Sequence, residues 1–178
     1  MTTLYTLTGY PRSRTAWLAN WLTWGRSWCY HEASRFAKNE DSYRSLMNLV
    51  LHASRDYEAI GNSDSALLLH LDWIPAGYPL VVVRRPESEV LQSLSRLMGT
   101  KPAKTLMERL TDAMKKAEER ASLVVDFADL GAFSTLARVW EACLPDQPMP
   151  KSRTVSLMEM NVQVPIERRR EEAEGWAG

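Results

Sequence analysis

The sequence predicts an α/β domain in which helices cover both faces of a parallel sheet. Two apolar runs rich in β-branched residues, 79–84 and 122–127, have the composition of strands that are buried on both faces. Amphipathic segments separate the predicted strands, and this alternation is typical of strand–helix–strand units with right-handed crossovers. We therefore expect one three-layer domain over residues 1–178, in which the tail 151–178 is the least defined part.

The composition is that of an ordinary globular chain, and it excludes several classes of function. Hydrophobic residues make up 45% of the chain, and 22 basic residues balance 22 acidic ones. A general nucleic-acid-binding protein would carry a basic excess, so we expect no nucleic-acid partner. Cys29 and Cys143 are too few for a disulfide framework. No signal peptide and no apolar run of membrane length is found, which predicts a cytoplasmic protein without a membrane partner.

The N-terminal segment 4–24 predicts a strand, a tight polar turn and a helix in immediate succession. Strand-forming residues lead into the breaker Gly-Tyr-Pro at 9–11, and apolar residues recur at helical spacing from residue 16. The turn 12–15, Arg-Ser-Arg-Thr, places two guanidinium groups and two hydroxyls at the start of that helix. Free N–H groups and the helix dipole favour anions at this position. The turn therefore predicts a phosphate or sulfate site, and the alternative is an ordinary Ser/Thr-capped turn.

The remaining chain continues the alternation of strands and helices. We expect strands at 27–33, 57–61, 79–84 and 122–127, and helices at 40–57, 87–98, 101–121 and about 129–144. Residues 62–65 have the composition of a turn, as does the proline-rich stretch 145–150. Segment 66–74 fits a helix or a short buried strand, and the capping residues Asp64 and Ser65 favour the helix.

Polar residues follow several of the predicted strands. In parallel sheets with helices on both faces, ligands bind at the carboxyl ends of the strands. That rule brings His31, Glu32, residues 62–64 and the pair 84–85 to one edge with the turn 10–15. The chain contains no Gly-Lys-Ser/Thr sequence, so the turn is not a Walker A loop. No Cys/His cluster has metal-ligand spacing, and we expect no metal site.

Residues 11–17, Pro-Arg-Ser-Arg-Thr-Ala-Trp, resemble the 5′-phosphosulfate loop of sulfotransferases, which use 3′-phosphoadenosine 5′-phosphosulfate (PAPS). The resemblance implies a P-loop NTPase-like architecture with Arg12 as the basic residue that binds the 5′-phosphosulfate. It further implies that Ser13 and Thr15 supply phosphate-binding hydroxyls. In the cytosolic members of the family, the residue at the position of Trp17 stacks on adenine.

The loop departs from the family pattern at Arg14, where the family usually has glycine. Glycine permits backbone conformations and close approaches that arginine resists. Either the loop is reshaped or Arg14 adds a charged contact to the bound donor.

Residues 80–94 resemble the second motif of the same family, in which a strand ending in Arg leads into an Arg-x-Pro turn and a helix. The resemblance implies that Arg84 and Ser93 share the 3′-phosphate. Ser93 lies one residue further from Arg84 than the family spacing places its serine. This leaves Arg85 as an alternative to Arg84, and Ser88 as an alternative hydroxyl.

Sulfuryl transfer also requires a base that accepts a proton from the acceptor. His31 and Glu32 are the candidates, and Glu32 has the stronger claim because a carboxylate is a base at neutral pH. Strand alternation would place the two side chains on opposite faces, so that only one reaches the acceptor. Asp64 and His70 are further candidates, although a helix over 66–74 would turn His70 away.

We therefore predict a small sulfotransferase that moves a sulfuryl group from PAPS to a hydroxyl or amine and releases 3′-phosphoadenosine 5′-phosphate (PAP). The alternatives are a phosphoryl-transferring relative and a nucleotide-binding relative that has lost catalysis. The tail 168–176 faintly resembles the family's basic C-terminal segment, which contacts the 3′-phosphate, and is also typical of a charged helix.

Overall fold

The computed structural model describes residues 2–53 and 56–159 and contains one sheet of five strands. Its order is β2-β3-β1-β4-β5, and all four neighbouring pairs are parallel. The strands are β1 (Thr3–Gly9), β2 (Ser27–His31), β3 (Ala59–Ser63), β4 (Leu80–Arg84) and β5 (Leu123–Asp126). The predicted parallel sheet is thereby confirmed.

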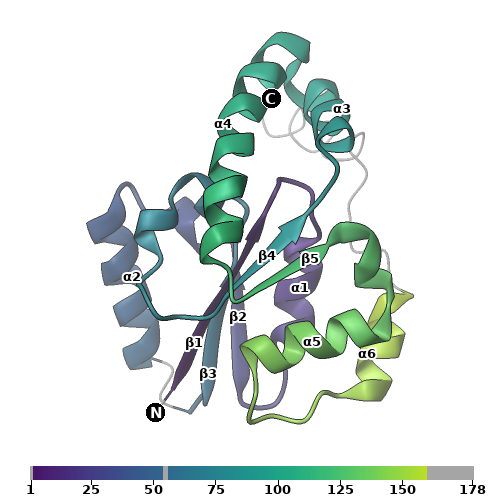
Figure 1. Cartoon of the computed structure of the whole chain (residues 1–178). Coiled ribbons are helices and arrows are strands. Elements are labelled where there is room, and N and C mark those ends of the chain that lie inside the picture. Colours follow the sequence, from purple (N-terminus) through teal and green to yellow (C-terminus); the bar gives the residue numbers. More distant parts are fainter. Residues whose placement is uncertain (1, 54–55, 160–178) are drawn as a thin grey trace, which may run out of the picture.

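Helices cover both faces of this sheet and complete the three predicted layers (Figure 1). One face carries α1 (Thr15–Leu22), α5 (Phe133–Cys143) and α6 (Lys151–Met158). The other carries α2 (Glu40–Ala53), α3 (Glu87–Met98) and α4 (Thr100–Arg120). Short 3-10 helices complete the described chain: η1 (Ala33–Phe36), η2 (Ala66–Leu69), η3 (Leu71–Trp73) and η4 (Phe127–Gly131). No helix in these ranges is long and apolar enough to cross a membrane.

Strand β4 shows why its sequence is a continuous apolar run. Val81 and Val83 are fully buried against the α1/α5 face, and Leu80 and Val82 are fully buried against the α3/α4 face. Because successive side chains of a strand point to opposite faces, a strand covered on both sides needs apolar residues at every position.

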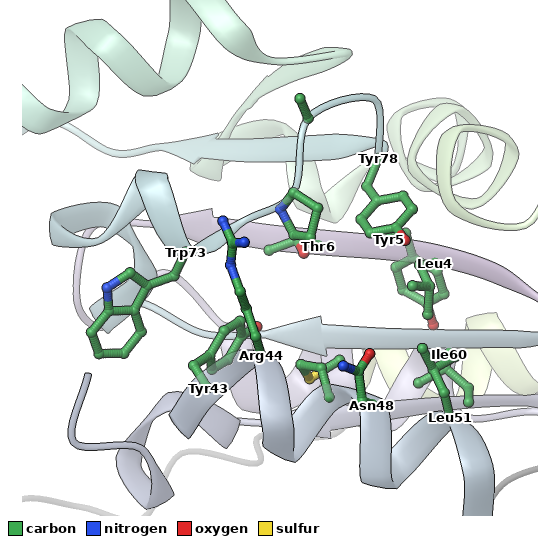
Figure 2. Close-up of a pocket in the computed structure, with 13 residues that line it drawn as sticks. Leu4, Tyr5, Thr6, Tyr43, Arg44, Asn48, Leu51, Ile60, Trp73 and Tyr78 are labelled. Carbon is green, nitrogen blue, oxygen red and sulfur yellow. The ribbon is translucent and has the colours of Figure 1, made fainter. Parts of the chain in front are cut away.

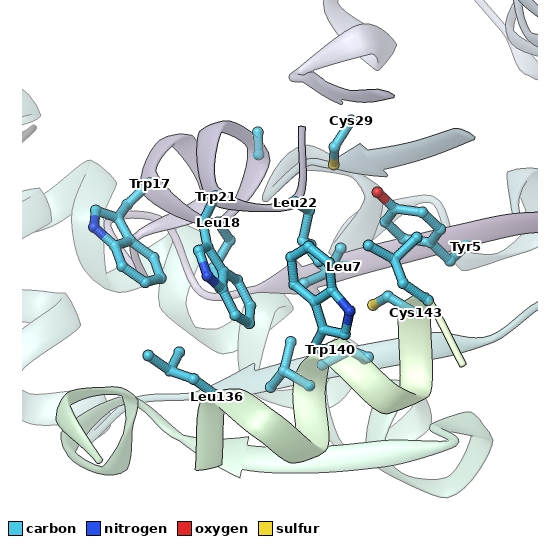
Figure 3. Packing of buried hydrophobic residues seen from close by; sticks show 14 of the residues in the cluster. Tyr5, Leu7, Trp17, Leu18, Trp21, Leu22, Cys29, Leu136, Trp140 and Cys143 are labelled. Atoms are coloured by element: carbon cyan, nitrogen blue, oxygen red, sulfur yellow. The ribbon is translucent and has the colours of Figure 1, made fainter. Parts of the chain in front are cut away.

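Three tryptophans form the centre of the α1/α5 face (Figure 3). The rings of Trp17 and Trp21 stack with centroids 5.6 Å apart, and the ring of Trp140 meets Trp21 edge-on at 5.3 Å. Trp17 Nε1 donates to the Leu157 carbonyl at 2.8 Å, and Trp21 Nε1 donates to Thr154 Oγ1 at 2.9 Å. Both donors are therefore satisfied by α6, which is held against α1.

The third strand lies two residues later than predicted, over Ala59–Ser63 instead of 57–61. Asn62 and Ser63, which were expected in a turn, are fully buried strand residues that pair with β1. Gly61 at the centre of this strand makes room for the ring of Tyr5, since a Cβ there would lie 2.0 Å from a ring carbon.

Segment 66–74 is helical, as favoured, but it forms the two short helices η2 and η3 instead of one α-helix. Arg120 at the end of α4 holds this segment by donating hydrogen bonds to the carbonyl oxygens of Leu71, Ile74 and Pro75. The helix predicted over 129–144 is likewise divided, with η4 preceding α5.

Candidate functional site

The loop between β1 and α1 lies at the carboxyl edge of the sheet. Arg12 and Arg14 have φ values of 71° and 59°, whereas Ser13 between them does not have a positive φ. Such alternation directs successive backbone N–H groups into one concavity, which is a recurrent anion-binding arrangement. The N–H groups of Ser13 and Arg14 meet no acceptor among the described residues, and the first helical bond runs from Leu18 N to Arg14 O.

The hydroxyl side chains at the start of α1 also indicate an anion site. Ser13 is fully buried, yet its Oγ has no hydrogen-bond partner among the described residues. A buried hydroxyl without a partner is costly, and a bound anion would accept a hydrogen bond from it. Thr15 Oγ1 lies 3.4 Å from Nε2 of His31. Ser63 Oγ, at the end of β3, is a second buried hydroxyl without a described partner.

The backbone of Arg14 shows how the loop accommodates arginine where sulfotransferases usually have glycine. Arg14 adopts the left-handed conformation that the usual glycine would permit, so the substitution does not prevent this glycine-type backbone. A left-handed conformation costs a residue with a Cβ about 1–2 kcal/mol. The guanidinium Cζ lies 5.4 Å from the ring centroid of Phe127, and it makes no ion pair with any described carboxylate.

The two arginines that follow β4 diverge. Arg84 makes a bidentate pair with Asp126, with N–O distances of 2.7 and 3.1 Å, and this hydrogen bonding lowers the pKa of the Asp126 carboxyl. Arg85 Nη1 instead donates to the carbonyl oxygen of Arg12 at 3.0 Å. The structure therefore brings Arg85 to the loop. Ser93, in the second turn of α3, has no hydrogen bond to the loop among the residues described.

His31 and Glu32 lie on the same side of the strand end, which corrects the expected alternation. The strand ends at His31, and Glu32 has φ 55°, so its carboxylate turns back toward the imidazole. Glu32 Oε1 lies 3.6 Å from His31 Nε2, and about two fifths of each side chain is exposed. A base here could reach an acceptor that arrives from solvent.

The other two base candidates have structural partners. Asp64 is fully buried, and its carboxylate oxygens accept hydrogen bonds from the N–H groups of Ser34 at 2.8 Å and Ala66 at 2.9 Å. His70 stacks on Trp73 with ring centroids 4.3 Å apart. Asp64 thus holds two turns in place, and His70 belongs to the aromatic packing beneath α2.

Trp17 does not lie where adenine stacking would require it. Its ring is buried against Trp21, and its Nε1–H is bonded to Leu157. Residue 17 is the third residue of α1, and this helical phase turns the side chain into the core. We therefore treat Trp17 as a core residue.

Phe127 belongs to the candidate site although its apolar side chain does not mark it as an anion-binding residue. It directly follows Asp126 at the end of β5, and its ring contacts the guanidinium groups of Arg14 and Arg85. Its place at the end of the predicted strand 122–127 is the signal in the sequence that marks it, because ligands bind at the carboxyl ends of such strands.

Two cavities are relevant to the location of ligands. One, of about 420 Å³, lies beside the loop and is lined in part by Tyr10, Arg84 and Arg85. The other, of about 440 Å³, lies under α2 between aromatic side chains that include Trp73 (Figure 2). The second cavity touches β1 at residues 4–6, in the half of the strand away from the loop.

The side chains of the described residues also determine whether a metal ion could bind. Within residues 2–53 and 56–159, no group of three or more His, Cys, Asp or Glu side chains could hold a metal ion. The predicted basic segment 168–176 lies outside the described residues.

Comparison with known proteins finds similar folds among solved structures. No protein-family model matches the chain, and no curated protein sequence matches it. A sulfotransferase from Alicyclobacillus acidocaldarius has a similar structure, with a TM-score of 0.52, 14% sequence identity, and coverage of 99% of this chain and 92% of that chain. A shikimate kinase from Bacteroides thetaiotaomicron gives a TM-score of 0.45 at 16% identity, over 78% of this chain and 96% of that chain.

The strand order and the loop between β1 and α1 define an α/β protein with a P-loop-like fold, similar to that of the sulfotransferase structure. At these identities, the likeness shows the fold.

Proposed function

We propose that the protein is a sulfotransferase that takes a sulfuryl group from PAPS, transfers it to a hydroxyl or amine acceptor and releases PAP. The observation that carries this proposal is the loop itself. Its left-handed residues Arg12 and Arg14 flank Ser13, whose buried hydroxyl has no described partner. A P-loop kinase would place a lysine at its phosphate loop, whereas this loop carries arginines and hydroxyls.

The loop residues fit the anionic end of such a donor. Bound PAPS would supply an activated sulfuryl group and a 5′-phosphate as leaving group. Arg12 and the N–H groups of the loop stabilise negative charge at this position, and Ser13 and Thr15 offer hydroxyls to the same anion. Fixed donors of this kind contribute most where charge develops during the reaction.

The residues for the 3′-phosphate are the pair after β4. The resemblance names Arg84 with Ser93, but Arg84 is engaged by Asp126. Arg85 donates to the loop backbone. Arg84 and Arg85 both line the cavity of about 420 Å³ beside the loop, where a nucleotide has room. We expect substitution of Arg85 to weaken PAP binding more than substitution of Arg84.

The proposed base is Glu32, with His31 between it and the loop. The imidazole Nε2 faces both Thr15 Oγ1 at 3.4 Å and Glu32 Oε1 at 3.6 Å. Glu32 accepts the proton of the acceptor hydroxyl or amine, and His31 orients the carboxylate or contacts the transferred group.

A single-turnover assay with radiolabelled PAPS tests the proposal, with 4-nitrophenol, an aliphatic alcohol and an aliphatic amine as acceptors. The wild type should transfer sulfate to at least one of them. Glu32→Gln should slow transfer by about 100-fold or more while PAP affinity changes little, because a base acts in the chemical step. His70→Asn is the control and should retain the transfer rate.

Two results would contradict these assignments. Phosphoryl transfer from ATP without any transfer from PAPS would identify a kinase-like enzyme. Normal transfer by Glu32→Gln, beside a folded but inactive His70→Asn, would move the base to His70.

A further inference from the structure

Phe127, which follows β5, lies beside two arginines, Arg14 in the loop after β1 and Arg85 directly after β4. The ring centroid of Phe127 lies 5.4 Å from Cζ of Arg14 and 4.6 Å from Cζ of Arg85. Phe127 is itself packed against the buried cluster on the α1/α5 face, so the core fixes the ring. Guanidinium groups at these distances are attracted to the negative face of an aromatic ring.

The two arginines depend on this ring to different degrees. Arg85 is also held by the carbonyl of Arg12 at 3.0 Å and by Glu89 Oε2 at 3.0 Å. The Arg14 side chain makes no hydrogen bond or ion pair within the described residues, and its guanidinium lies over the ring of Phe127. A long side chain without hydrogen bonds or ion pairs has much rotamer freedom, so loss of the ring contact would let it reorient.

The charges at this ring are unbalanced. Two cations approach one ring, and Arg14 has no described carboxylate to offset its charge. Like charges that are close together are stabilised by a bound anion. The unpartnered hydroxyl of Ser13, buried at the same helix start, is a separate indication that an anion belongs here.

We propose that Phe127 is a positioning residue, which holds the guanidinium groups of Arg14 and Arg85 so that both meet the phosphate groups of one nucleotide. This role rests on the proposed function. The positioning role also explains why residue 14 is an arginine although glycine would adopt its left-handed backbone without strain. The ring fixes the arginine side chain, and the fixed guanidinium can then bind the nucleotide.

The affinity for PAP tests the role. Phe127→Leu should weaken PAP binding about tenfold, the effect of a cation–π contact of ordinary strength. Phe127→Tyr keeps the aromatic face and should bind like the wild type. In an Arg14→Ala background the effect of Phe127→Leu should shrink, because one of the two positioned groups is gone. Equal effects in both backgrounds, or no rescue by tyrosine, would show that Phe127 acts through packing.

A spectroscopic measurement tests the contact without any ligand. Arginine Nε–Hε signals beside an aromatic ring are shifted by its ring current, so the signals of Arg14 and Arg85 should move in Phe127→Leu and in the milder Phe127→Met. Unchanged signals would refute the positioning role. A wild type that binds no PAP would refute the proposed function, while the arginine signals would still decide the role of Phe127.

Discussion

Arg14 is the residue at which backbone and side-chain preferences conflict most clearly. Its left-handed conformation costs about 1–2 kcal/mol relative to glycine, and its guanidinium carries an uncompensated charge among the described residues. Strain of this kind persists where the surrounding structure imposes it, and it is concentrated at functional sites. At residue 14, stability therefore favours glycine, whereas anion binding favours arginine.

Two substitutions of Arg14 measure this separation. Arg14→Ala and Arg14→Gly both remove the guanidinium and should lose PAP affinity equally. Only glycine relieves the positive φ, so the glycine variant should exceed the alanine variant in unfolding free energy by about 1 kcal/mol. Urea unfolding and calorimetric titration measure the two quantities. Equal stability of the two variants would mean that the left-handed backbone at residue 14 is not strained.

Ser13 offers a second trade-off between stability and binding. Its buried Oγ has no described partner, so Ser13→Ala should raise the unfolding free energy of the ligand-free protein by about 1 kcal/mol. The same variant should bind PAP more weakly, because the anion loses a hydrogen-bond donor. A thermal melt with and without PAP measures both effects. A destabilised ligand-free variant would show that the hydroxyl already has a partner.

At the level of single residues, the sequence predicted chemical types better than orientations. The grouping of His31 and Glu32 at a strand end was correct, but alternation placed them on opposite faces. The left-handed Glu32, which the sequence does not mark with glycine or asparagine, brings them together. Trp17 was misassigned for a similar reason, since the phase of α1 decides whether its ring meets the ligand or the core.

At the level of elements, prediction succeeded where burial requires one residue type. Strand β4 was recognisable because both of its faces are covered and every position is apolar. Strand β3 was placed two residues early because Asn62 and Ser63 look like turn residues, although they pair with β1. The neighbours that bury them come from elsewhere in the chain, and a local pattern cannot contain that information.

Gly61 explains the composition of β3 and can be tested directly. A Cβ at Gly61 would lie 2.0 Å from the ring of Tyr5, which is buried and hydrogen-bonded to Ser27 at 3.1 Å. Gly61→Ala should therefore lower the unfolding free energy by about 3 kcal/mol. Gly131→Ala is the matched control, because nothing lies within 4 Å of its added Cβ. Similar urea midpoints for both variants would mean that the sheet tolerates the extra atom.

At the scale of the whole molecule, burial of ionisable groups makes stability depend on alkaline pH. Burial raises the pKa of the Cys29 thiol to about 12, and burial raises that of Cys143 well above its usual range. An unfolded thiol titrates near about 8.5. The unfolded state therefore loses these protons first, so the stability present below that pH is lost as the pH rises toward the folded pKa values.

We expect the unfolding free energy to fall between pH 9 and pH 10 by about 1.4 kcal/mol per pH unit for each thiol. Urea unfolding across this range measures the slope. A variant with Cys29→Ala and Cys143→Ala has a lower baseline but should show a flatter slope. Parallel slopes in the variant and the wild type would assign the alkaline loss to other groups, such as the buried tyrosines.

The central claim is that the loop between β1 and α1, with the arginines after β4, binds a nucleotide that carries a 3′-phosphate. Calorimetric titration of the wild type with PAP, AMP and ATP tests it most directly. PAP and AMP differ only in the 3′-phosphate, and a charge-assisted contact to that group should favour PAP by about 1.5–3 kcal/mol, or more than about tenfold in Kd. Arg85→Ala should remove most of this preference. Equal affinity for PAP and AMP, or tighter binding of ATP than of PAP, would contradict the account.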